Sequence, residues 1–332
     1  WSDTVKYREF GKTGWNVSEV GLGTWALGSD AWGDVDEGQA LEVLEEAIEQ
    51  GINFFDTADV YGDGLSEKRI GKVLDSTDER IYVATKFGRR IDPHRAEDYT
   101  KDNLERFLDR SLENLGVDTI DLVQLHCPPT EVYYQPEVFE AMEEFVEKGK
   151  IRYYGVSVEK VEEGLKAIEY PNLTSVQIIF NMFRQRPADH FLSRCREENV
   201  AVIPRVPLAS GLLTGKYDKD VTFPENDHRN FNRDGEAFDV GETFAGVDFE
   251  TGLEAVERLE EVKPKSYSTA QMAIKWILSH DEISVIIPGA KSKEHVRDNA
   301  EASDLPDLPP RVNHEARKVY KELIKEQVHH RW

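Results

Sequence analysis

Four side chains that could donate or relay a proton lie close to the ends of short apolar segments. Asp56, Lys86 and His126 each end such a segment, and Tyr61 follows Asp56 within the run Asp-Thr-Ala-Asp-Val-Tyr-Gly. In a parallel α/β barrel the carboxyl ends of the strands lie on one rim, and active sites form there. The spacing therefore predicts a proton-donating site.

This set suits the reduction of a carbonyl group. A phenol has a pKa of ~10, and a nearby ammonium lowers it, so Lys86 could activate Tyr61. Asp56 would pair with Lys86, and His126 would orient the substrate oxygen. No side chain supplies hydride, so a nicotinamide cofactor is required. The alternative interpretation is a buried ion pair with a histidine at a strand end.

The segments that position these residues alternate between strand and helix patterns. The expected strands are residues 20–25, 53–56, 81–86, 120–126, 152–157, 175–181, 201–206 and 284–288. The expected helices include residues 37–50, 101–115, 136–148 and 188–198. Eight strand–helix units predict a (β/α)8 TIM barrel, an α/β fold, with residues 1–332 in a single domain.

One connection, residues 216–247 after the seventh strand, is much longer than the others. Loops of this length are usually functional lids or disordered segments. Its aromatic residues favour a packed loop. They are Phe223, Phe231, Phe238 and Phe244. Two helices, at about 251–261 and 269–279, are expected to follow.

With these motifs, the chain resembles the aldo-keto reductases from about Tyr7 to Leu308. Further matching runs are Gly155-Val156-Ser157, the run from Pro207 to Tyr217, and Ile287-Pro288-Gly289-Ala290. The resemblance implies that Tyr61 is the general acid, supported by Lys86, Asp56 and His126. It also implies a nicotinamide cofactor and a small carbonyl substrate.

The resemblance also assigns residues to the cofactor. Ser157 and Gln177 would bind the nicotinamide carboxamide, and glycines near residues 208–216 would let the backbone approach the pyrophosphate. The implied set on the strand ends and this loop is Gly23, Thr24, Trp25, Asp56, Ser157, Gln177, Arg205, Pro207, Leu208, Ser210, Gly211, Leu213, Gly215 and Lys216. Two positions depart from the family pattern: Val158 replaces an asparagine, and Arg205 replaces a tyrosine that stacks on the nicotinamide.

A basic segment after the last strand would hold the 2'-phosphate of NADP(H), because a helix N-terminus favours anions. Lys291, Ser292 and His295 would line the phosphate pocket, and Asn299 would face the adenine. Gly289 precedes this helix, and Arg297 also belongs to the basic cluster. NADP(H) is therefore expected over NAD(H). The alternative is an ordinary solvated helix face.

The substrate pocket is expected to have an aromatic wall of Trp25, Trp32 and Tyr61, although the tryptophans could instead belong to the core. Such a wall suits aldehydes, diketones or open-chain sugars. Two other functions fit the same residues. One is a cofactor-binding regulatory subunit of the potassium-channel beta type, and the other is a sugar or polyol dehydrogenase running in the oxidative direction.

The net charge of −23 disfavours nucleic acids and anionic membranes as partners. It indicates either an ordinary acidic enzyme or a protein of a high-salt cytoplasm. The scarce cysteines, Cys127 and Cys195, favour a reducing, cytoplasmic compartment, and no signal peptide is recognised before Tyr7. Cys127 could form a reactive pair with His126 or simply pack. No metal-ligand spacing is found, and a monomer or small homo-oligomer is expected.

Overall fold

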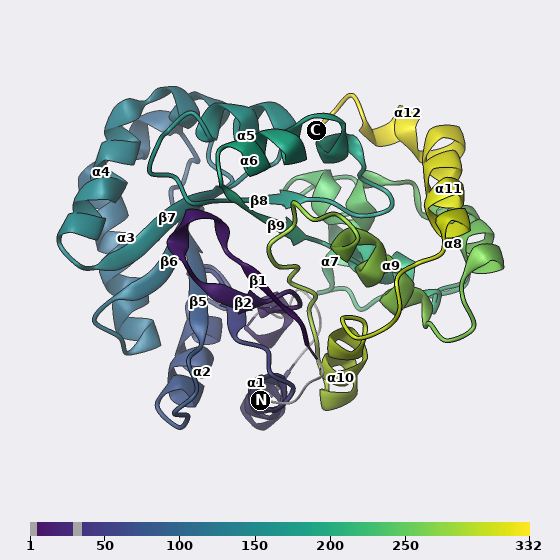
Figure 1. The fold of residues 1–332 in the computed structure, drawn as a ribbon. Helices are drawn as coiled ribbons and strands as arrows, with labels where there is room; N and C mark the ends of the chain where they lie inside the picture. Colours follow the sequence, from purple (N-terminus) through teal and green to yellow (C-terminus); the bar gives the residue numbers. More distant parts are fainter. Residues whose placement is uncertain (1–4, 29–34) are drawn as a thin grey trace.

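The centre of the molecule is a parallel sheet surrounded by helices (Figure 1). The computed structural model describes residues 5–28 and 35–332. The sheet has seven strands in the order β3-β4-β5-β6-β7-β8-β9, which is also their order in the chain. The strands are β3 Leu22–Gly23, β4 Phe54–Asp56, β5 Tyr82–Phe87, β6 Ile120–His126, β7 Ile151–Ser157, β8 Ser175–Ile179 and β9 Ala201–Arg205.

The expected eighth strand at 284–288 is not a continuous strand in the structure. Isolated parallel bridges instead join Ile286 to Val20 and Gly289 to Gly23 at the β3 edge, and Ile283 to Val202 on β9. Pro288 interrupts the ladder here, because proline has no backbone N–H to donate. The segment nevertheless contacts both edge strands of the seven-stranded sheet.

Helices follow the strands as the sequence periodicity predicts. The helices are α1 Glu37–Glu49, α2 Leu65–Leu74, α3 Lys101–Leu115, α4 Pro136–Glu147, α5 Val161–Ala167, α6 Phe191–Glu197, α7 His228–Phe231, α8 Phe249–Val262, α9 Thr269–Leu278, α10 Lys293–Glu301, α11 Pro310–Val319 and α12 Lys325–Val328. The expected helix at 188–198 begins only at Phe191, because a 3-10 turn occupies Arg186–Asp189.

Helix α3 shows how local sequence sets these bounds. The Thr100 side chain caps the first turn by accepting from the Asn103 N–H at 3.3 Å. Gly116 ends the helix in the left-handed conformation, with φ of 67°. The buried face repeats at helical spacing through Leu104, Phe107, Leu108, Ser111 and Leu115.

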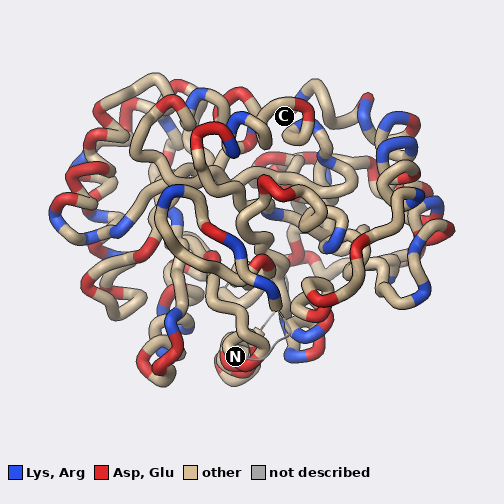
Figure 2. Tube along the Cα trace, in the orientation of Figure 1, with Lys and Arg blue, Asp and Glu red and all other residues tan. Residues whose placement is uncertain are grey.

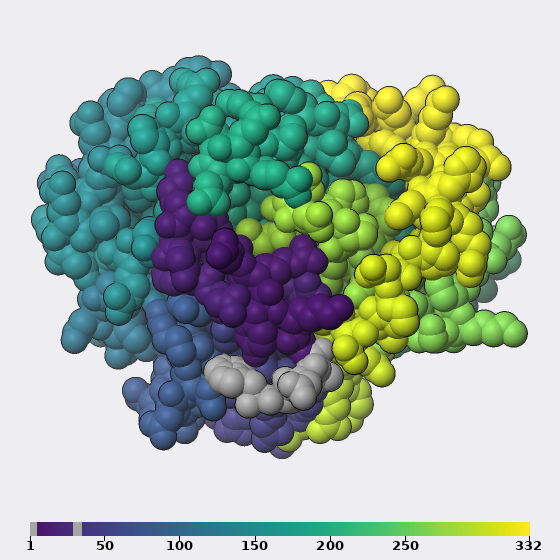
Figure 3. Space-filling model, viewed as in Figure 1, coloured from purple at the N-terminus to yellow at the C-terminus, as the bar shows by residue number. Residues whose placement is uncertain are grey.

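An N-terminal hairpin that the sequence analysis missed closes one end of the sheet. It consists of β1 Tyr7–Glu9 and β2 Asn16–Ser18. Phe10 and Trp15 of the hairpin join a buried cluster with residues of the strands, including Phe54, Leu122 and Ile203. The hairpin crosses the face shown in Figure 1, and the same residues cover that face in Figure 3. The polar strand ends lie at the opposite rim.

The long segment after β9 is packed, as expected from its aromatic residues. It contains α7 and two 3-10 turns, Val240–Glu242 and Phe244–Gly246. Phe244 is buried and Phe223 packs against the core, whereas Phe231 is exposed. No helix in the described part of the chain is long and apolar enough to cross a membrane.

Candidate active site

Asp56, Lys86 and Tyr61 form a connected chain at the carboxyl ends of β4 and β5. The Lys86 ammonium donates to Asp56 Oδ1 at 2.6 Å and to the Thr57 carbonyl at 2.8 Å. The same nitrogen lies 3.3 Å from the Tyr61 hydroxyl. Lys86 and Asp56 are almost completely buried. The structure therefore brings together these three residues in the order that the sequence suggested.

Amides from two more strands hold the other oxygen of Asp56. Gln177 donates to Asp56 Oδ2 at 2.8 Å and Gln124 donates to it at 3.2 Å. Gln177 also donates to Gln124 Oε1 at 3.1 Å. These bonds fix the carboxylate that orients Lys86. The sequence analysis gave Gln124 no role. The available signal was its position two residues before His126, which places both side chains on the same face of the strand.

The electrostatics of Tyr61 combine the predicted effect of Lys86 with a larger effect of burial. Burial raises the pKa of the phenol, and this outweighs the lowering by Lys86. Lys86 lowers the pKa of Tyr61 as expected, but burial makes the net shift upward. Although burial opposes it, Asp56 holds the pKa of Lys86 above its usual value. The phenol thus stays protonated near neutral pH beside a permanently charged ammonium, which is the state that a proton donor needs.

His126 ends β6 and meets Tyr61 edge to face, with ring centroids 6.1 Å apart. Burial first, and then the charges of Arg89 and Lys86, hold the pKa of the imidazole well below its usual value. His126 is therefore neutral and has one N–H to donate. Its Nδ1 has no hydrogen-bond partner among the described residues.

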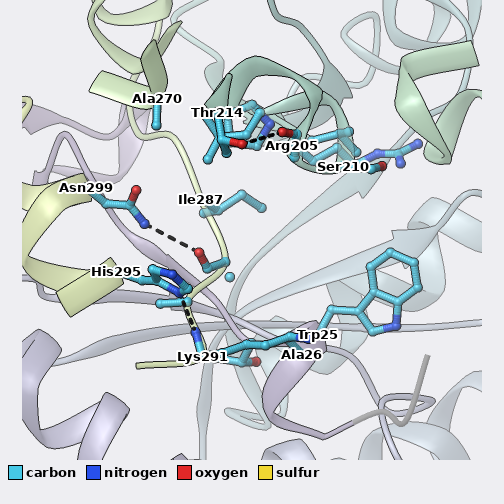
Figure 4. A pocket seen from close by; sticks show the side chains of 18 of the residues that line it. Trp25, Ala26, Arg205, Ser210, Thr214, Ala270, Ile287, Lys291, His295 and Asn299 are labelled. Carbon is cyan, nitrogen blue, oxygen red and sulfur yellow. Dashed lines mark hydrogen bonds between the residues drawn. The ribbon is translucent and has the colours of Figure 1, made fainter. Parts of the chain in front are cut away.

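A cavity of about 360 Å³ opens at this rim and extends to α10. In Figure 4, Trp25 lies on one side of it, and His295 and Asn299 lie on the other. Predicted site residues that line it are Gly23, Thr24, Trp25, Asp56, Tyr61, His126, Gln177, Arg205, Pro207, Leu208, Ser210, Gly211, Lys216, Gly289, Lys291, His295 and Asn299. Predicted residues that lie outside the lining are Lys86, Ser157, Leu213, Gly215 and Ser292.

Several lining residues were given no role by the sequence analysis. They include Tyr217, Arg229 and Glu242 from the long segment and Asp298 from α10. Only the fold of the long segment places its charged residues at the cavity. The sole signal in the sequence was the presence of these charges among its aromatic residues.

The backbone after β9 is shaped for close approach by a ligand. Ser210 and Gly211 have φ of 55° and 96° within the turn Ala209–Thr214. A Cβ atom on Gly211 would lie 2.1 Å from the Tyr217 hydroxyl, so only glycine fits there. The Ser210 hydroxyl joins this turn to the long segment, donating to the Glu242 carbonyl at 3.1 Å and accepting from the Phe244 N–H at 3.0 Å.

Helix α10 begins at the far end of the cavity. Ser292 caps it by accepting from the His295 N–H at 3.3 Å, so this side chain serves the helix. Burial lowers the pKa of both Lys291 and His295, and His295 is consequently neutral at pH 7. Arg297 instead pairs with Glu46 of α1 through two 2.8 Å contacts and does not line the cavity.

Arg205 ends β9 and lines the cavity near His126. Its guanidinium donates to the Val158 carbonyl at 3.1 Å and lies 3.6 Å from Cys127 Sγ. Glu242 Oε1 is 3.5 Å from Arg205 and 2.7 Å from Arg89. Burial raises the pKa of the Cys127 thiol, so the structure favours packing over a reactive thiolate.

Cys127, Glu159 and Glu242 lie close enough to share a metal ion in principle. The sequence analysis found no such set, because the three residues come from different loops. Arg89 pairs with both Glu242 and Glu159, and Arg205 pairs with Glu242. Guanidinium groups therefore already supply positive charge to these two carboxylates.

The aromatic wall is present in part. Trp25 stacks on Tyr61 at 6.1 Å and also contacts His228 at 4.9 Å and Phe238 at 5.8 Å between ring centroids. The last two residues come from the long segment and were not predicted to join the wall. Trp32 lies outside the described residues.

The sequence model of the aldo/keto reductase family matches residues 19–321. A curated relative is "Aldo-keto reductase yakc [NADP(+)]" of Schizosaccharomyces pombe, 30% identical over 85% of this chain and 83% of the relative. Another is the "NADH-specific methylglyoxal reductase" of Escherichia coli, 27% identical over 91% and 94%. A solved structure, the glycerol dehydrogenase AKR11B4 of Gluconobacter oxydans, superposes with a TM-score of 0.79 at 27% identity, covering 96% of each chain. The chain belongs to the aldo/keto reductase family.

Proposed function

We propose that the protein reduces aldehyde or ketone carbonyls with NADPH and that Tyr61 donates the proton. The observation that carries this proposal is the buried chain from Asp56 through Lys86 to the Tyr61 hydroxyl, which faces a long cavity. When bound, the nicotinamide supplies the hydride. We also propose that segment 283–289 closes the barrel in place of an eighth strand, because its isolated bridges reach both edges of the sheet.

The residues present fit a dinucleotide along the cavity. Gln177 would face the nicotinamide end, the turn at Ser210 and Gly211 would accommodate the pyrophosphate, and Lys291 would meet the 2'-phosphate. Lys216 lines the same cavity and adds positive charge, whereas the Arg229 guanidinium, which also lines it, already pairs with Asp227. This cluster of cations in an acidic chain favours the more highly charged NADP(H).

Tyr61 and His126 would both bond the substrate oxygen. The neutral His126 donates a hydrogen bond, and the protonated phenol transfers its proton as negative charge develops on the oxygen. The buried Lys86 then stabilises the phenolate that remains. The raised pKa of Tyr61 keeps the phenol in this acid form near neutral pH.

Oxidation of polyols is the second candidate, because the solved glycerol dehydrogenase has the same fold as this chain and is similar to it in sequence. The same tyrosine would accept a proton in that direction, and its raised pKa would move the oxidative optimum to alkaline pH.

A screen of NADPH and NADH oxidation over a carbonyl panel, at low and high KCl, tests the proposal. Steady NADPH-dependent turnover of at least one carbonyl is expected. No turnover across the panel would favour a cofactor-binding regulatory subunit and contradict the proposed function.

A further inference from the structure

A second cavity, of about 490 Å³, lies beside the C-terminal helices α11 and α12, which are drawn in yellow in Figure 1. Residues from the 3-10 turn Arg186–Asp189, the end of α9 and the segment 313–329 build its wall. It shares no lining residue with the cavity of the candidate active site. The proposed function therefore gives this second cavity no role.

Three basic side chains of one helical stretch line the second cavity, and we call them the basic stripe. Arg317, Lys321 and Lys325 are spaced four residues apart, so they share one face of the stretch. Within this stretch, Tyr320–Ile324 form a π-helical turn, in which the Lys325 N–H donates to the Tyr320 carbonyl. Such a turn holds more residues than the about 3.6 of an α-helical turn, so residues four apart come closer to one line along the helix. Turns of this kind are frequent at functional sites.

The acidic side chains of the same stretch pair elsewhere. Glu315 and Glu322 pair with Arg258 of α8, at 2.8 Å and 2.7 Å. No carboxylate of the described residues forms a salt bridge with any cation of the basic stripe. Like charges four residues apart repel each other and destabilise a helix. The chain thus keeps uncompensated positive charge here, although its 64 Asp and Glu exceed its 41 Lys and Arg.

The other titratable groups at this cavity leave the positive charge in excess. Asp189 is the one carboxylate among the described lining residues, and it lies 3.2 Å from Nε2 of His329. The Tyr320 hydroxyl lies 2.8 Å from Nδ1 of the same ring. Burial lowers the pKa of both His329 and His280, so these imidazoles are neutral at pH 7. Three cations facing one carboxylate leave an excess of two positive charges.

Buried aromatic side chains line the same cavity. Trp276 is 4% exposed and Tyr320 is 6% exposed. His280 meets Trp276 with ring centroids 4.8 Å apart. The volume lies within the range of about 300–1,000 Å³ that is typical of small-molecule pockets, in which apolar walls hold the body of a ligand and a few polar groups orient it. The cavity is therefore large enough for an organic ligand attached to an anionic group.

We propose that the second cavity binds a small organic molecule that carries a phosphate monoester. Such a group has a charge of roughly −1.5 to −2 at pH 7 and three acceptor oxygens, which match the two excess charges and the N–H donors of the basic stripe. A monocarboxylate would leave one positive charge uncompensated, and the net charge of −23 disfavours a nucleic acid. This site lies outside the proposed active site and does not depend on the proposed function.

The test is isothermal titration calorimetry with phenyl phosphate and phenol, which differ only in the phosphate group. The protein is kept in saturating NADP+ and phosphate-free buffer, so that the first cavity is not available to the probe. Wild type should bind phenyl phosphate at least ~10-fold more tightly than phenol, the scale of one charged hydrogen bond, and molar KCl should weaken the binding.

Matched variants of the helical stretch locate the binding. Arg317→Gln and Lys321→Gln should each raise the Kd of phenyl phosphate roughly 10-fold. Lys318 is an exposed cation of the same helix that does not line the cavity. Lys318→Gln therefore removes the same charge and should leave the Kd unchanged. Phenyl phosphate should also raise the thermal midpoint of wild type and Lys318→Gln, and should not raise that of the Arg317→Gln/Lys321→Gln double variant.

Three results would overturn the inference. The first is equal affinity of wild type for phenyl phosphate and phenol, or an equal loss of phenyl phosphate binding in Lys318→Gln and Lys321→Gln. The second is a loss of binding in Lys291→Ala but not in Lys321→Gln, which would place the phosphate in the first cavity. The third is a wild-type oligomer, found by sedimentation, that binds no phenyl phosphate and dissociates in the double variant, because the basic stripe would then contact an acidic surface of a second copy.

Discussion

At the scale of single residues, Tyr61 lies between two opposing influences. Burial raises its pKa, and the ammonium of Lys86, 3.3 Å away, lowers it. The proposed reaction needs both, because the phenol must be protonated before proton transfer and stabilised as phenolate afterwards. Asp56 acts one step further away, by holding Lys86 in place.

This arrangement predicts unequal effects of two substitutions. Lys86→Met should raise the pKa of Tyr61 further and reduce kcat strongly, because no cation would stabilise the phenolate. Asp56→Asn should retain more activity, since the Thr57 carbonyl still binds the ammonium. Steady-state kinetics on both variants measure the difference. Small and equal losses would contradict the assigned roles.

At the scale of elements, the turn between β4 and α2 carries Tyr61 and also contains Asp59. This carboxyl is buried, with Arg90 Nε 3.2 Å away. Burial, with a further contribution from Glu67, raises the pKa of Asp59 to about 7 in spite of Arg90. The turn that presents Tyr61 therefore contains a carboxyl that titrates near neutral pH.

The raised pKa of Asp59 has a defined effect on stability. Between its unfolded pKa of ~4 and about 7, the folded state holds a proton that the unfolded state has released. The stability contribution of Asp59 therefore falls as pH rises through this window and is constant above it. Asp59→Asn should stabilise the protein more at pH 8 than at pH 5, as measured by thermal midpoints. The pKa of Glu159 is also raised to about 7, so this residue contributes the same pH dependence of stability to the wild type and to the variant. Equal shifts at the two pH values would show that Arg90 keeps Asp59 ionised.

Helix α10 offers a second test at this scale. Lys291 precedes the helix and lines the cavity, whereas Arg297 pairs with Glu46 outside the lining. Lys291→Ala should raise KM for NADPH and leave KM for NADH nearly unchanged, because only NADPH carries the 2'-phosphate. Arg297→Ala is the matched control and should leave the NADPH/NADH ratio of kcat/KM unaltered. Equal losses with both cofactors in Lys291→Ala would assign this segment another role.

Elements with strong local patterns could be predicted from the sequence, and those set by distant contacts could not. The strand at 120–126 and the helix at 101–115 are confirmed to the residue, because apolar runs and caps define them. The N-terminal hairpin is short, and its aromatic residues become buried only by packing against residues of the strands. Glu242 and Arg229 reach the cavity through the fold of a long segment without a repeating pattern. The net rise in the pKa of Tyr61 could not be predicted, because a sequence reveals the nearby cation but not the depth of burial.

At the scale of the whole molecule, acidic and basic residues alternate along the outer helices, with acidic residues in excess (Figure 2). Many cations are already engaged in surface ion pairs, such as Arg258 with Glu315 and Glu322. The remaining negative charge should repel itself in dilute buffer.

Thermal midpoints should consequently rise from low to molar KCl, because salt screens this repulsion. NaCl at the same ionic strength should give a similar rise if screening is the cause. A flat or falling curve would remove the interpretation as a high-salt protein and leave the catalytic proposal untouched.

The central claim is that Tyr61 donates the proton in carbonyl reduction. Tyr61→Phe removes only the hydroxyl, so Asp56 and Lys86 remain paired and the fold should be retained. The decisive measurement is kcat for NADPH-dependent reduction of a carbonyl that the wild type turns over, with NADPH affinity measured separately by fluorescence. We expect unchanged NADPH affinity and a fall in kcat of at least ~100-fold, the scale of general acid catalysis. A Tyr61→Phe variant with near wild-type kcat would contradict the account.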